Sequence, residues 1–266
     1  MEKLSVFITT FNNAATLETC LESVTWADEI VVLDSFSDDA TLKIAERYGC
    51  RVFQHEFQGY GPQKQMALEK TSHAWVLLLD ADEALSPEAQ DEIRRLLEAG
   101  PQADGYTMPR REQMFWQFAH PATRMNRYLR LFDKRKGSMD DMPVHAAPRV
   151  NGTIGRLESC FVHYGEPDVH TKVEKINAYS SGLAEHKAER GNRANPWPMV
   201  FYPPFFFIRI YILKRNFVNG WAGFIASVVS AFYAFLKYAK RYEHQRKLGR
   251  LRKPDRATEE AANEPP

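Results

Sequence analysis

The chain has 266 residues, a formal net charge of +1 and a hydrophobic content of 44%. This content is enough for a sizeable core, and the near-zero charge argues against a general nucleic-acid binder, which needs a positive field to attract phosphates. The three cysteines form no CxxC pair, which fits a reducing compartment and argues against a disulfide framework or a zinc knuckle.

The N-terminal part of the sequence alternates predicted strands with predicted helices. Short, apolar, β-rich runs predict strands at 4–9, 29–34, 51–55 and 74–80. Apolar residues at helical spacing and capping signals predict helices between these runs and after the last one. The alternation predicts an α/β fold with a Rossmann-like, mostly parallel sheet and helices on both faces. Ligands bind such sheets beyond the carboxyl ends of the strands.

The sequence changes in character from about residue 105. Two further strands are predicted at 105–108 and 128–132, and the aromatic, basic stretch between them is typical of a loop that shapes a second-substrate site. A helix is predicted at 169–187. The polar residues 254–266 are predicted to form a disordered tail.

The C-terminal region, 166–253, is predicted to be helical and membrane-associated. Residues 216–236 contain no charged residue, which is about the length that a bilayer span requires, but asparagine, glycine and serine dilute the run. Basic residues flank it, and aromatic residues crowd 197–211 upstream. This arrangement favours an interfacial platform. A packed core or oligomer face and a true span remain as alternatives.

Two carboxylates, Asp80 and Asp82, directly follow the most apolar predicted strand. Residues i and i+2 share a side as the chain leaves a sheet, and two carboxylates there suit a hard divalent cation, Mg²⁺ or Mn²⁺. An isolated DxD is a weak signal, because two such acids are as readily solvated loop residues or helix caps.

Polar groups also gather at the ends of the first two predicted strands. Asp34 ends the second strand, with Asp39 in the polar loop behind it. Thr9, Thr10 and Asn12 end the first strand. Helix capping explains each residue taken alone, but it explains the joint pattern at three strand ends poorly. The joint pattern predicts a nucleotide site.

These motifs resemble family 2 glycosyltransferases of GT-A fold. The matching elements are Thr9-Thr10-Phe11-Asn12, Asp34, the Ser-x-Asp-x-Thr run at 37–41 and Asp80-Ala81-Asp82. The segments Asp-Ala-Asp-Glu, Arg-Leu-Phe and Lys-Ile-Asn-Ala-Tyr-Ser are similar to the lipopolysaccharide-core β-glucosyltransferase branch. The resemblance covers roughly residues 3–245. It implies a catalytic domain at 1–165, with a nucleotide-sugar-binding half at 1–104 and an acceptor half at 105–165.

The resemblance also implies a reaction and a set of partners. The expected reaction is an inverting, Mn²⁺- or Mg²⁺-dependent transfer of a hexose from a nucleotide sugar, expected to be a UDP-sugar, to a lipid-linked or oligosaccharide acceptor. Asp34 is expected at the nucleobase, Asp80 on the ribose side and Asp82 at the metal. Because no signal-peptide pattern is present, we expect the enzyme in the cytoplasm, peripheral at the inner face of the cytoplasmic membrane and without a nucleic-acid partner.

The general base is harder to predict. In this branch an acid commonly follows a Val-His pair, but here Ala146 follows Val144-His145. Asp140 and Asp141 lie just upstream, and we predict that one of them, Asp141 in preference, takes the proton from the acceptor hydroxyl. A polar turn is the alternative for both residues.

Three basic side chains complete the predicted site. His163 ends an apparent strand and resembles the late histidine that completes the metal site in several GT-A enzymes, although a lone histidine is more often structural. Lys64 lies near a predicted helix N-terminus that faces the nucleotide or solvent. Arg130 either steadies the diphosphate or forms a salt bridge.

Three rival functions stay open on the sequence. A DxD phosphotransferase would carry its motif on the first strand, and a sugar nucleotidyltransferase would carry a glycine-rich loop after that strand, whereas residues 9–14 contain no glycine. A non-catalytic membrane scaffold would use only the C-terminal region.

Overall fold

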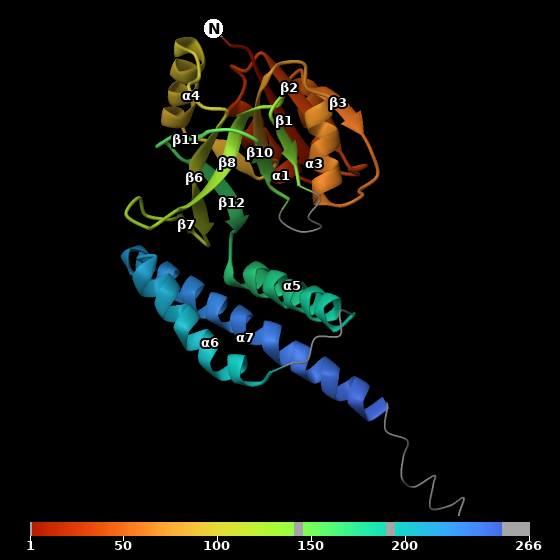
Figure 1. Cartoon of the computed structure of the whole chain (residues 1–266), viewed down its shortest axis with the longest axis vertical. Helices are drawn as coiled ribbons and strands as arrows, with labels where there is room; N and C mark the ends of the chain where they lie inside the picture. The colour runs from red at the N-terminus through yellow and green to blue at the C-terminus, as the bar shows by residue number, and fades with distance from the viewer. Residues whose placement is uncertain (1, 141–145, 190–194, 252–266) are drawn as a thin grey trace, which may run out of the picture. The chain divides into compact units, whose positions relative to one another are not determined.

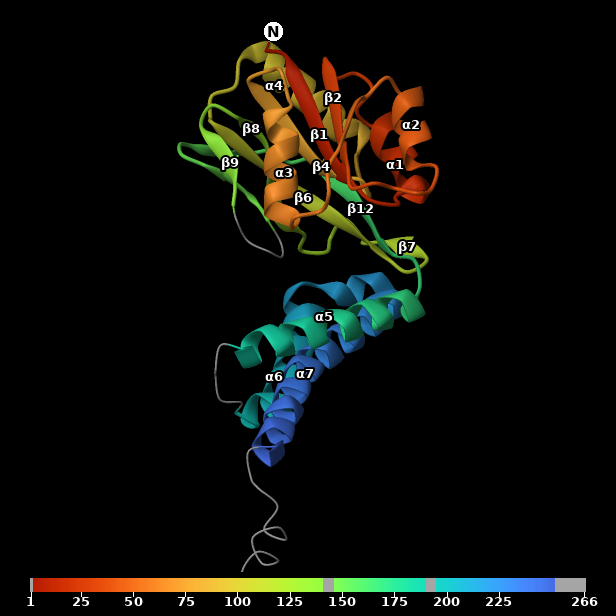
Figure 2. The same cartoon turned by 90° about the vertical axis from the view of Figure 1, so that its right-hand side faces the viewer.

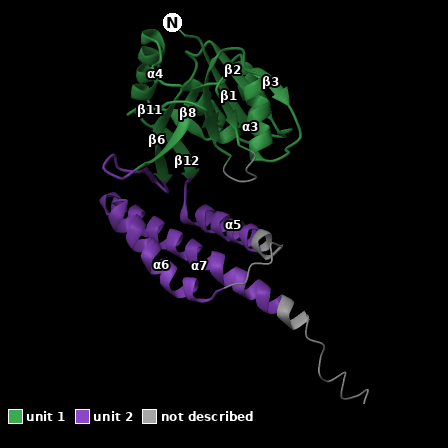
Figure 3. Ribbon diagram, viewed as in Figure 1, with its two compact units in different colours: residues 1–113, 125–165 green, residues 114–124, 166–266 purple. Residues whose placement is uncertain are grey.

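The computed structural model describes residues 2–140, 146–189 and 195–251. The chain divides into two compact units (Figure 3). The first comprises Met1–Gln113 and Met125–Gly165, and the second comprises Met114–Arg124 and Glu166–Pro266. The tail predicted at 254–266 lies outside the described residues.

The first four long strands of unit 1 are parallel, in the order β3-β2-β1-β4 (Figure 1). They are β1 (Leu4–Thr10), β2 (Glu29–Asp34), β3 (Arg51–Gln54) and β4 (Trp75–Asp80). The helices that connect them are α1 (Ala14–Glu22), α2 (Thr41–Arg47) and α3 (Tyr60–Glu69). Strand–helix–strand connections of this kind return each strand parallel to the last.

The order continues from β4 as β8-β6-β12-β5; β8 is antiparallel to both β4 and β6, and β12 is antiparallel to β5, whereas β11 pairs with β6 in parallel. The parallel arrangement predicted from the sequence therefore holds for the first half only, because no crossover helix connects β6 to β8. The remaining elements are β5 (Glu83–Leu85), α4 (Pro87–Ala99), β6 (Gly105–Met114), β8 (Asn126–Asp133), β11 (Ile154–Arg156) beside β6, β12 (Phe161–Glu166), and the separate pair β9 (Gly137–Met139) and β10 (Pro148–Val150).

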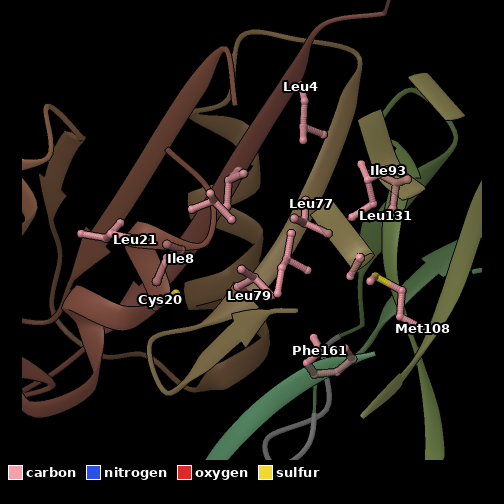
Figure 4. Close-up of a cluster of buried hydrophobic side chains, with 14 of the residues drawn as sticks. Leu4, Ile8, Cys20, Leu21, Leu77, Leu79, Ile93, Met108, Leu131 and Phe161 are labelled. Carbon is pink, nitrogen blue, oxygen red and sulfur yellow. The ribbon is translucent and has the colours of Figure 1, made fainter. Parts of the chain in front are cut away.

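Alternate residues of the central strands enter two cores, one on each face of the sheet. Leu77 and Leu79 of β4 pack in the core that α1, α2 and α4 cover (Figure 4). Val76 and Leu78 of the same strand pack in the core that α3 covers (Figure 2). Helices therefore cover both faces, which confirms the predicted fold class. The double cover also explains why the strand is apolar throughout.

Unit 2 is built from helices. They are α5 (Val169–Glu189), α6 (Trp197–Ile208) with a π-helical continuation (Arg209–Leu213), a 3-10 turn (Asn216–Asn219) and α7 (Gly220–Leu251). Helix α7 packs against both α5 and α6. By length and composition, Asn216–Lys247 is long and apolar enough to cross a membrane.

Residues 114–124, which include β7 (Gln117–Phe118), join these helices rather than the rest of the predicted acceptor half. Phe115 is buried in a cluster with Ala222 and Ala226 of α7. The side chain of Asn219 donates to Thr123 Oγ1 at 3.0 Å and accepts the His120 N–H at 2.7 Å. These contacts fasten the segment to the start of α7.

Candidate functional site

The carboxyl ends of β1, β2 and β4 lie side by side. The strand register pairs Thr10 with Asp34 and Thr9 with Asp80. The three polar strand ends that the sequence singled out therefore meet at one edge of the sheet, which is where ligands bind in open α/β folds.

Asp34 is fully buried and organises the loop that follows it. One carboxylate oxygen accepts the Ser37 hydroxyl at 2.5 Å, and the other accepts the Ser37 N–H at 2.8 Å and the Gln54 side chain at 3.2 Å. Asn12, whose φ of 52° is left-handed, joins the same loop: its N–H donates to Ser37 Oγ and its side-chain oxygen accepts the Asp38 N–H. These contacts hold the ends of β1 and β2 together.

Two other predicted nucleotide contacts also have structural partners. Asp39 accepts the N–H of Ala14, the first residue of α1, and the N–H of Thr41, the first residue of α2. The Thr10 hydroxyl donates to the Asn13 side chain at 3.1 Å. Asp39 therefore makes the helix-start contacts that a structural role predicts, and the nucleotide contacts of Thr10 and Asp39 stay predictions.

Asp80 is paired with two cations. Its Oδ1 lies 2.5 Å from Lys64 Nζ, and its Oδ2 lies 3.7 Å from Arg130. Burial alone would raise the pKa of Asp80, but Lys64 and Arg130 outweigh burial and hold that pKa well below its usual range. Asp80 is therefore ionised at neutral pH.

Glu83 closes the turn that carries Asp80 and Asp82, and no motif in the sequence pointed to a role for it. It is fully buried, and its Oε2 accepts the Asp80 N–H at 3.0 Å. Its Oε1 lies 2.6 Å from the buried Arg130 and 3.7 Å from Arg110. Burial raises the pKa of Glu83, and Arg130 opposes that rise. Arg130 thus forms the salt bridge that the sequence offered as an alternative, and its contact with a diphosphate stays a prediction.

Asp82 faces His163, although the two residues are 81 positions apart in the sequence. Strand β12 pairs with β5 so that His163 lies opposite Glu83, and the Tyr164 N–H donates to the Asp82 carbonyl at 2.8 Å. His163 Nε2 lies 3.3 Å from Asp82 Oδ2, and His163 Nδ1 lies 2.8 Å from Glu112 Oε2. Burial alone would lower the pKa of His163, but the hydrogen bonds to Asp82 and Glu112 outweigh it and raise the pKa to about 9.

Asp82 and His163 fit a divalent cation that is completed by substrate. Within the residues that the structure describes, no group of three or more His, Cys, Asp or Glu side chains is arranged to hold a metal ion. One carboxylate and one imidazole nitrogen 3.3 Å apart nevertheless suit Mn²⁺ or Mg²⁺. Such ions use few protein ligands at nucleotide sites and take the remaining oxygens from phosphates and water.

The two candidates for the general base differ in what the structure reveals. Asp140 Oδ1 accepts the Ala147 N–H at 3.0 Å, and its Oδ2 lies 3.6 Å from Arg149 Nε. Asp141, the preferred candidate, lies outside the described residues. Ala146, where an acid was expected, is buried with the α3-side core. The base therefore stays a prediction.

The chain resembles known proteins over most of its length. Residues 5–153 match the sequence model described as glycosyl transferase family 2. The lipopolysaccharide core biosynthesis glycosyltransferase LpsC of Rhizobium meliloti (strain 1021) is 32% identical over 248 residues, which cover 90% of this chain and 92% of that protein. An uncharacterized glycosyltransferase of Rickettsia felis is 33% identical, with 90% of this chain and 89% of that protein covered.

A solved structure shares the fold. The mannosyltransferase PcManGT from Pyrobaculum calidifontis, in complex with GDP-Man and Mn²⁺, superposes with a TM-score of 0.52 at 14% identity. The match covers 90% of this chain and 87% of that one. At this identity the likeness concerns the fold alone.

Proposed function

The chain belongs to glycosyl transferase family 2, and from that premise we propose that it transfers a hexose, with inversion, from a UDP-sugar to a lipopolysaccharide-core or other cell-surface glycan. The observation that carries the proposal is the Asp82–His163 pair beside Asp80, at the edge where β1, β2 and β4 end. The similarity to LpsC supports the class of acceptor. Inversion is carried over from the family resemblance.

Residues at different strand ends bind different parts of the nucleotide-sugar donor. Asp34 faces the nucleobase, with Thr9, Thr10, Asn12 and Asp39 around the nucleoside. Asp80 takes the ribose side, and its partners Lys64 and Arg130 bring positive charge toward the diphosphate. Guanidinium and ammonium groups are the side chains that bind phosphate oxygens most strongly.

Asp82 and His163 would hold Mn²⁺ or Mg²⁺. When bound there, the cation would neutralise the charge that develops on the leaving diphosphate. The chain's own contribution is to fix the two ligands: the backbone bond from Tyr164 to Asp82 and the turn closed by Glu83 set their positions before substrate arrives.

The acceptor is activated by a carboxylate. Asp141, or Asp140 beside it, takes the proton from the acceptor hydroxyl as the new glycosidic bond forms. Replacing both by asparagine is expected to abolish transfer while donor binding persists. If transfer survives in the double variant, the base lies elsewhere.

We expect the second unit to hold the enzyme at the inner face of the cytoplasmic membrane. Large hydrophobic side chains are exposed along α6 and its π-helical continuation, in the 3-10 turn and along α7: Trp197, Phe201, Phe205, Ile208 and Ile212, then Phe217 of the turn, then Trp221, Phe224, Val228, Phe232 and Phe235 of α7. We name this set the apolar stripe. Exposed apolar surface of this extent, with aromatic residues and flanking cations, suits the headgroup boundary of a bilayer.

The contacts on the other side of α7 favour a helix that lies at the membrane interface, and they oppose a helix that crosses the membrane. It packs against α5, and Lys240 Nζ donates to the Asn177 carbonyl at 2.7 Å and to Ser181 Oγ at 2.8 Å. Helix α5 also carries exposed charged groups such as Glu174. A spanning α7 would draw these groups into hydrocarbon, which is costly.

Asp82→Ala tests the proposal. We expect this variant to lose Mn²⁺-dependent turnover in a screen of nucleotide sugars, and to bind UDP in the presence of Mn²⁺ more weakly by calorimetry. Asp38→Ala, an exposed acid in the neighbouring loop, serves as the matched control. Intact turnover by Asp82→Ala would remove the metal site. No binding of any nucleotide by the parent enzyme would instead favour the scaffold alternative.

A further inference from the structure

We propose that Glu112 is a positioning residue, which fixes the His163 ring so that its Nε2 atom is presented beside Asp82. Glu112 lies on β6 and His163 on β12, and these strands are neighbours in the sheet. The inference rests on the proposed metal-dependent function and assigns a role to a residue that no motif of the sequence pointed to.

The distances show which carboxylate each ring nitrogen of His163 contacts. Glu112 Oε2 lies 2.8 Å from His163 Nδ1, while Nε2 on the far side of the ring lies 3.3 Å from Asp82 Oδ2. A carboxylate accepts hydrogen bonds only, so Nδ1 carries a proton in this contact. In the neutral ring the lone pair is then on Nε2. Histidines that ligate metals commonly have such a partner behind them, and it sets both the tautomer and the ring orientation.

Glu112 is itself held in place. The Nε and NH2 groups of Arg110 both lie 2.7 Å from Glu112 Oε1, the oxygen that does not face His163. The Arg110 guanidinium lies over the Tyr128 ring, 4.4 Å from its centroid. Each oxygen of Glu112 therefore has its own partner. A cation stacked on an aromatic ring is a firmer anchor than a solvated one.

The His163 ring is also limited by the backbone beside it. A Cβ atom at Gly165 would lie 3.3 Å from both Cε1 and Nδ1 of the ring. The edge of the ring that carries Nδ1 thus lies between Glu112 and the chain at Gly165. Rotation of the ring away from Asp82 would break the Glu112 contact.

A simple surface ion pair is the competing explanation. The Glu112 side chain is 35% exposed, and an ion pair at that exposure contributes little to stability. If only the charge of Glu112 mattered, the aspartate variant would bind Mn²⁺ like the parent and the glutamine variant would not. If the length of the side chain matters, the glutamine variant should bind Mn²⁺ better than the aspartate variant. Glutamine keeps an acceptor oxygen at the same distance from Cα, whereas the aspartate side chain is shorter by one methylene group.

The experiment compares Glu112→Gln, Glu112→Asp and Glu112→Ala in the full chain. Mn²⁺ binding is measured by electron paramagnetic resonance, with and without UDP, and transfer rates are followed as a function of Mn²⁺ concentration. We expect Glu112→Ala to weaken Mn²⁺ binding by about 10- to 100-fold, the usual cost of losing such a partner. Glu112→Asp should resemble Glu112→Ala, and Glu112→Gln, which keeps an acceptor for His163 Nδ1 but loses the second oxygen that Arg110 contacts, should fall between Glu112→Ala and the parent.

The kinetic pattern separates positioning from damage to the fold. For Glu112→Ala and Glu112→Asp, the Mn²⁺ concentration at half-maximal rate should rise, and kcat should recover at saturating Mn²⁺. Glu158→Ala is the matched control, because Glu158 is 81% exposed and pairs with Arg127 at 3.7 Å. It should bind Mn²⁺ like the parent.

The outcomes distinguish this inference from the proposed function. If Asp82→Ala and His163→Ala bind Mn²⁺ like the parent, the metal site itself is wrong. If those two lose binding while Glu112→Ala and Glu112→Asp keep it, the metal site stands and the positioning role fails. A parent-like Glu112→Asp with a weak Glu112→Gln overturns the role as well. Should Glu112→Ala not fold, the glutamine and aspartate variants decide the question.

Discussion

At the scale of single residues, Asp80 and Asp82 are two positions apart but have different partners. Asp80 contacts Lys64 and Arg130, while Asp82 contacts His163. A carboxylate that is already neutralised by two cations is a poor ligand for a third. The contacts therefore favour Asp82 as the metal ligand and leave Asp80 to position Lys64.

Lys64→Met tests that division. Removing the ammonium group leaves Asp80 with Arg130 alone, so the pKa of Asp80 should rise, and donor binding should weaken by about tenfold, which corresponds to one lost charge contact of about 1.4 kcal/mol. Calorimetry with UDP and Mn²⁺ measures the effect. Lys43→Met, which removes an exposed lysine from α2, is the control.

A double-mutant cycle with Asp80→Asn shows whether the two residues act as a pair. If they do, the double variant should lose less than the sum of the single losses, by about 0.5–3 kcal/mol. Strict additivity would mean that Lys64 acts on the nucleotide without Asp80.

Glu29 at the opposite end of β2 predicts a pH dependence of stability. Its carboxylate accepts the Ser5 hydroxyl at 2.5 Å, the Ser72 N–H at 2.7 Å and the Ser72 hydroxyl at 2.7 Å, and it pairs with Arg51. Burial alone would raise the pKa of Glu29, but these bonds lower it from 4.5 to about 2. The folded state therefore binds the proton less tightly than the unfolded state.

The direction in which stability changes with pH follows from this difference in proton binding. The stabilisation is fully present above about pH 4.5, and it is lost as the pH falls toward 2. Glu29→Gln should lower the melting temperature at pH 7, and the difference from the parent should shrink between pH 4.5 and pH 3. A difference that stays constant over this range would assign the effect to lost packing.

At the scale of elements, the sequence predicted the apolar strands best. The range predicted for β2, 29–34, agrees with the structure, because a buried strand with a polar end has a clear signal. Strand β6 extends to Met114, well beyond the predicted 105–108, because its second half is polar and lacks that signal. Glu112, a main contact of the site, lies in this missed half.

The site was predictable only in its local motifs. Asp34 and Asp80 end their strands and Asp82 lies two residues further on, so each is visible from its neighbours in the chain. The contacts of Glu83 with Arg130 and of Glu112 with His163 connect residues 47 and 51 positions apart. Such pairs depend on the order of the antiparallel strands, which a single sequence does not reveal.

Two helical glycines of unit 2 predict opposite effects of the same substitution. A Cβ at Gly223 in α7 would lie 2.0 Å from the Asn216 carbonyl oxygen, whereas a Cβ at Gly182 in α5 would meet nothing within 4 Å. Gly223→Ala should therefore force the 3-10 turn away from α7 and destabilise the unit. Gly182→Ala should stabilise it by up to about 1 kcal/mol through helix propensity. Thermal unfolding in mild detergent compares them, and equal effects would contradict the close packing at Gly223.

At the scale of the whole molecule, the two strands that carry Glu112 and His163 both continue into unit 2 within three residues. Strand β6 enters it at Met114 and β12 at Glu166. Inside unit 2 the Phe115 N–H donates to the Glu166 carbonyl at 3.1 Å. The chain thus passes between the two units at three points, at 113–114, 124–125 and 165–166.

The apolar stripe gives the last prediction, which concerns where the enzyme works. Trp221 and Phe232 are 76% and 45% exposed, and burial of such a side chain in an apolar phase contributes about 1.5–3 kcal/mol. Trp221→Glu with Phe232→Glu should therefore weaken flotation with phosphatidylglycerol-containing vesicles by more than about tenfold. Ile154→Glu, at a 47% exposed apolar site in unit 1, should float like the parent.

The parent and the double variant together distinguish the three interpretations of the C-terminal region. An interfacial platform predicts that alkaline carbonate releases the parent from vesicles and that high salt weakens its binding in part, since salt screens the attraction to anionic headgroups but not the apolar contribution. A span predicts that the parent resists both treatments. An oligomer face predicts no flotation of the parent, and a dimer that the double variant converts to a monomer. Turnover of a water-soluble acceptor should be unchanged in the double variant, because the substituted side chains belong to α7 and the proposed catalytic groups belong to unit 1.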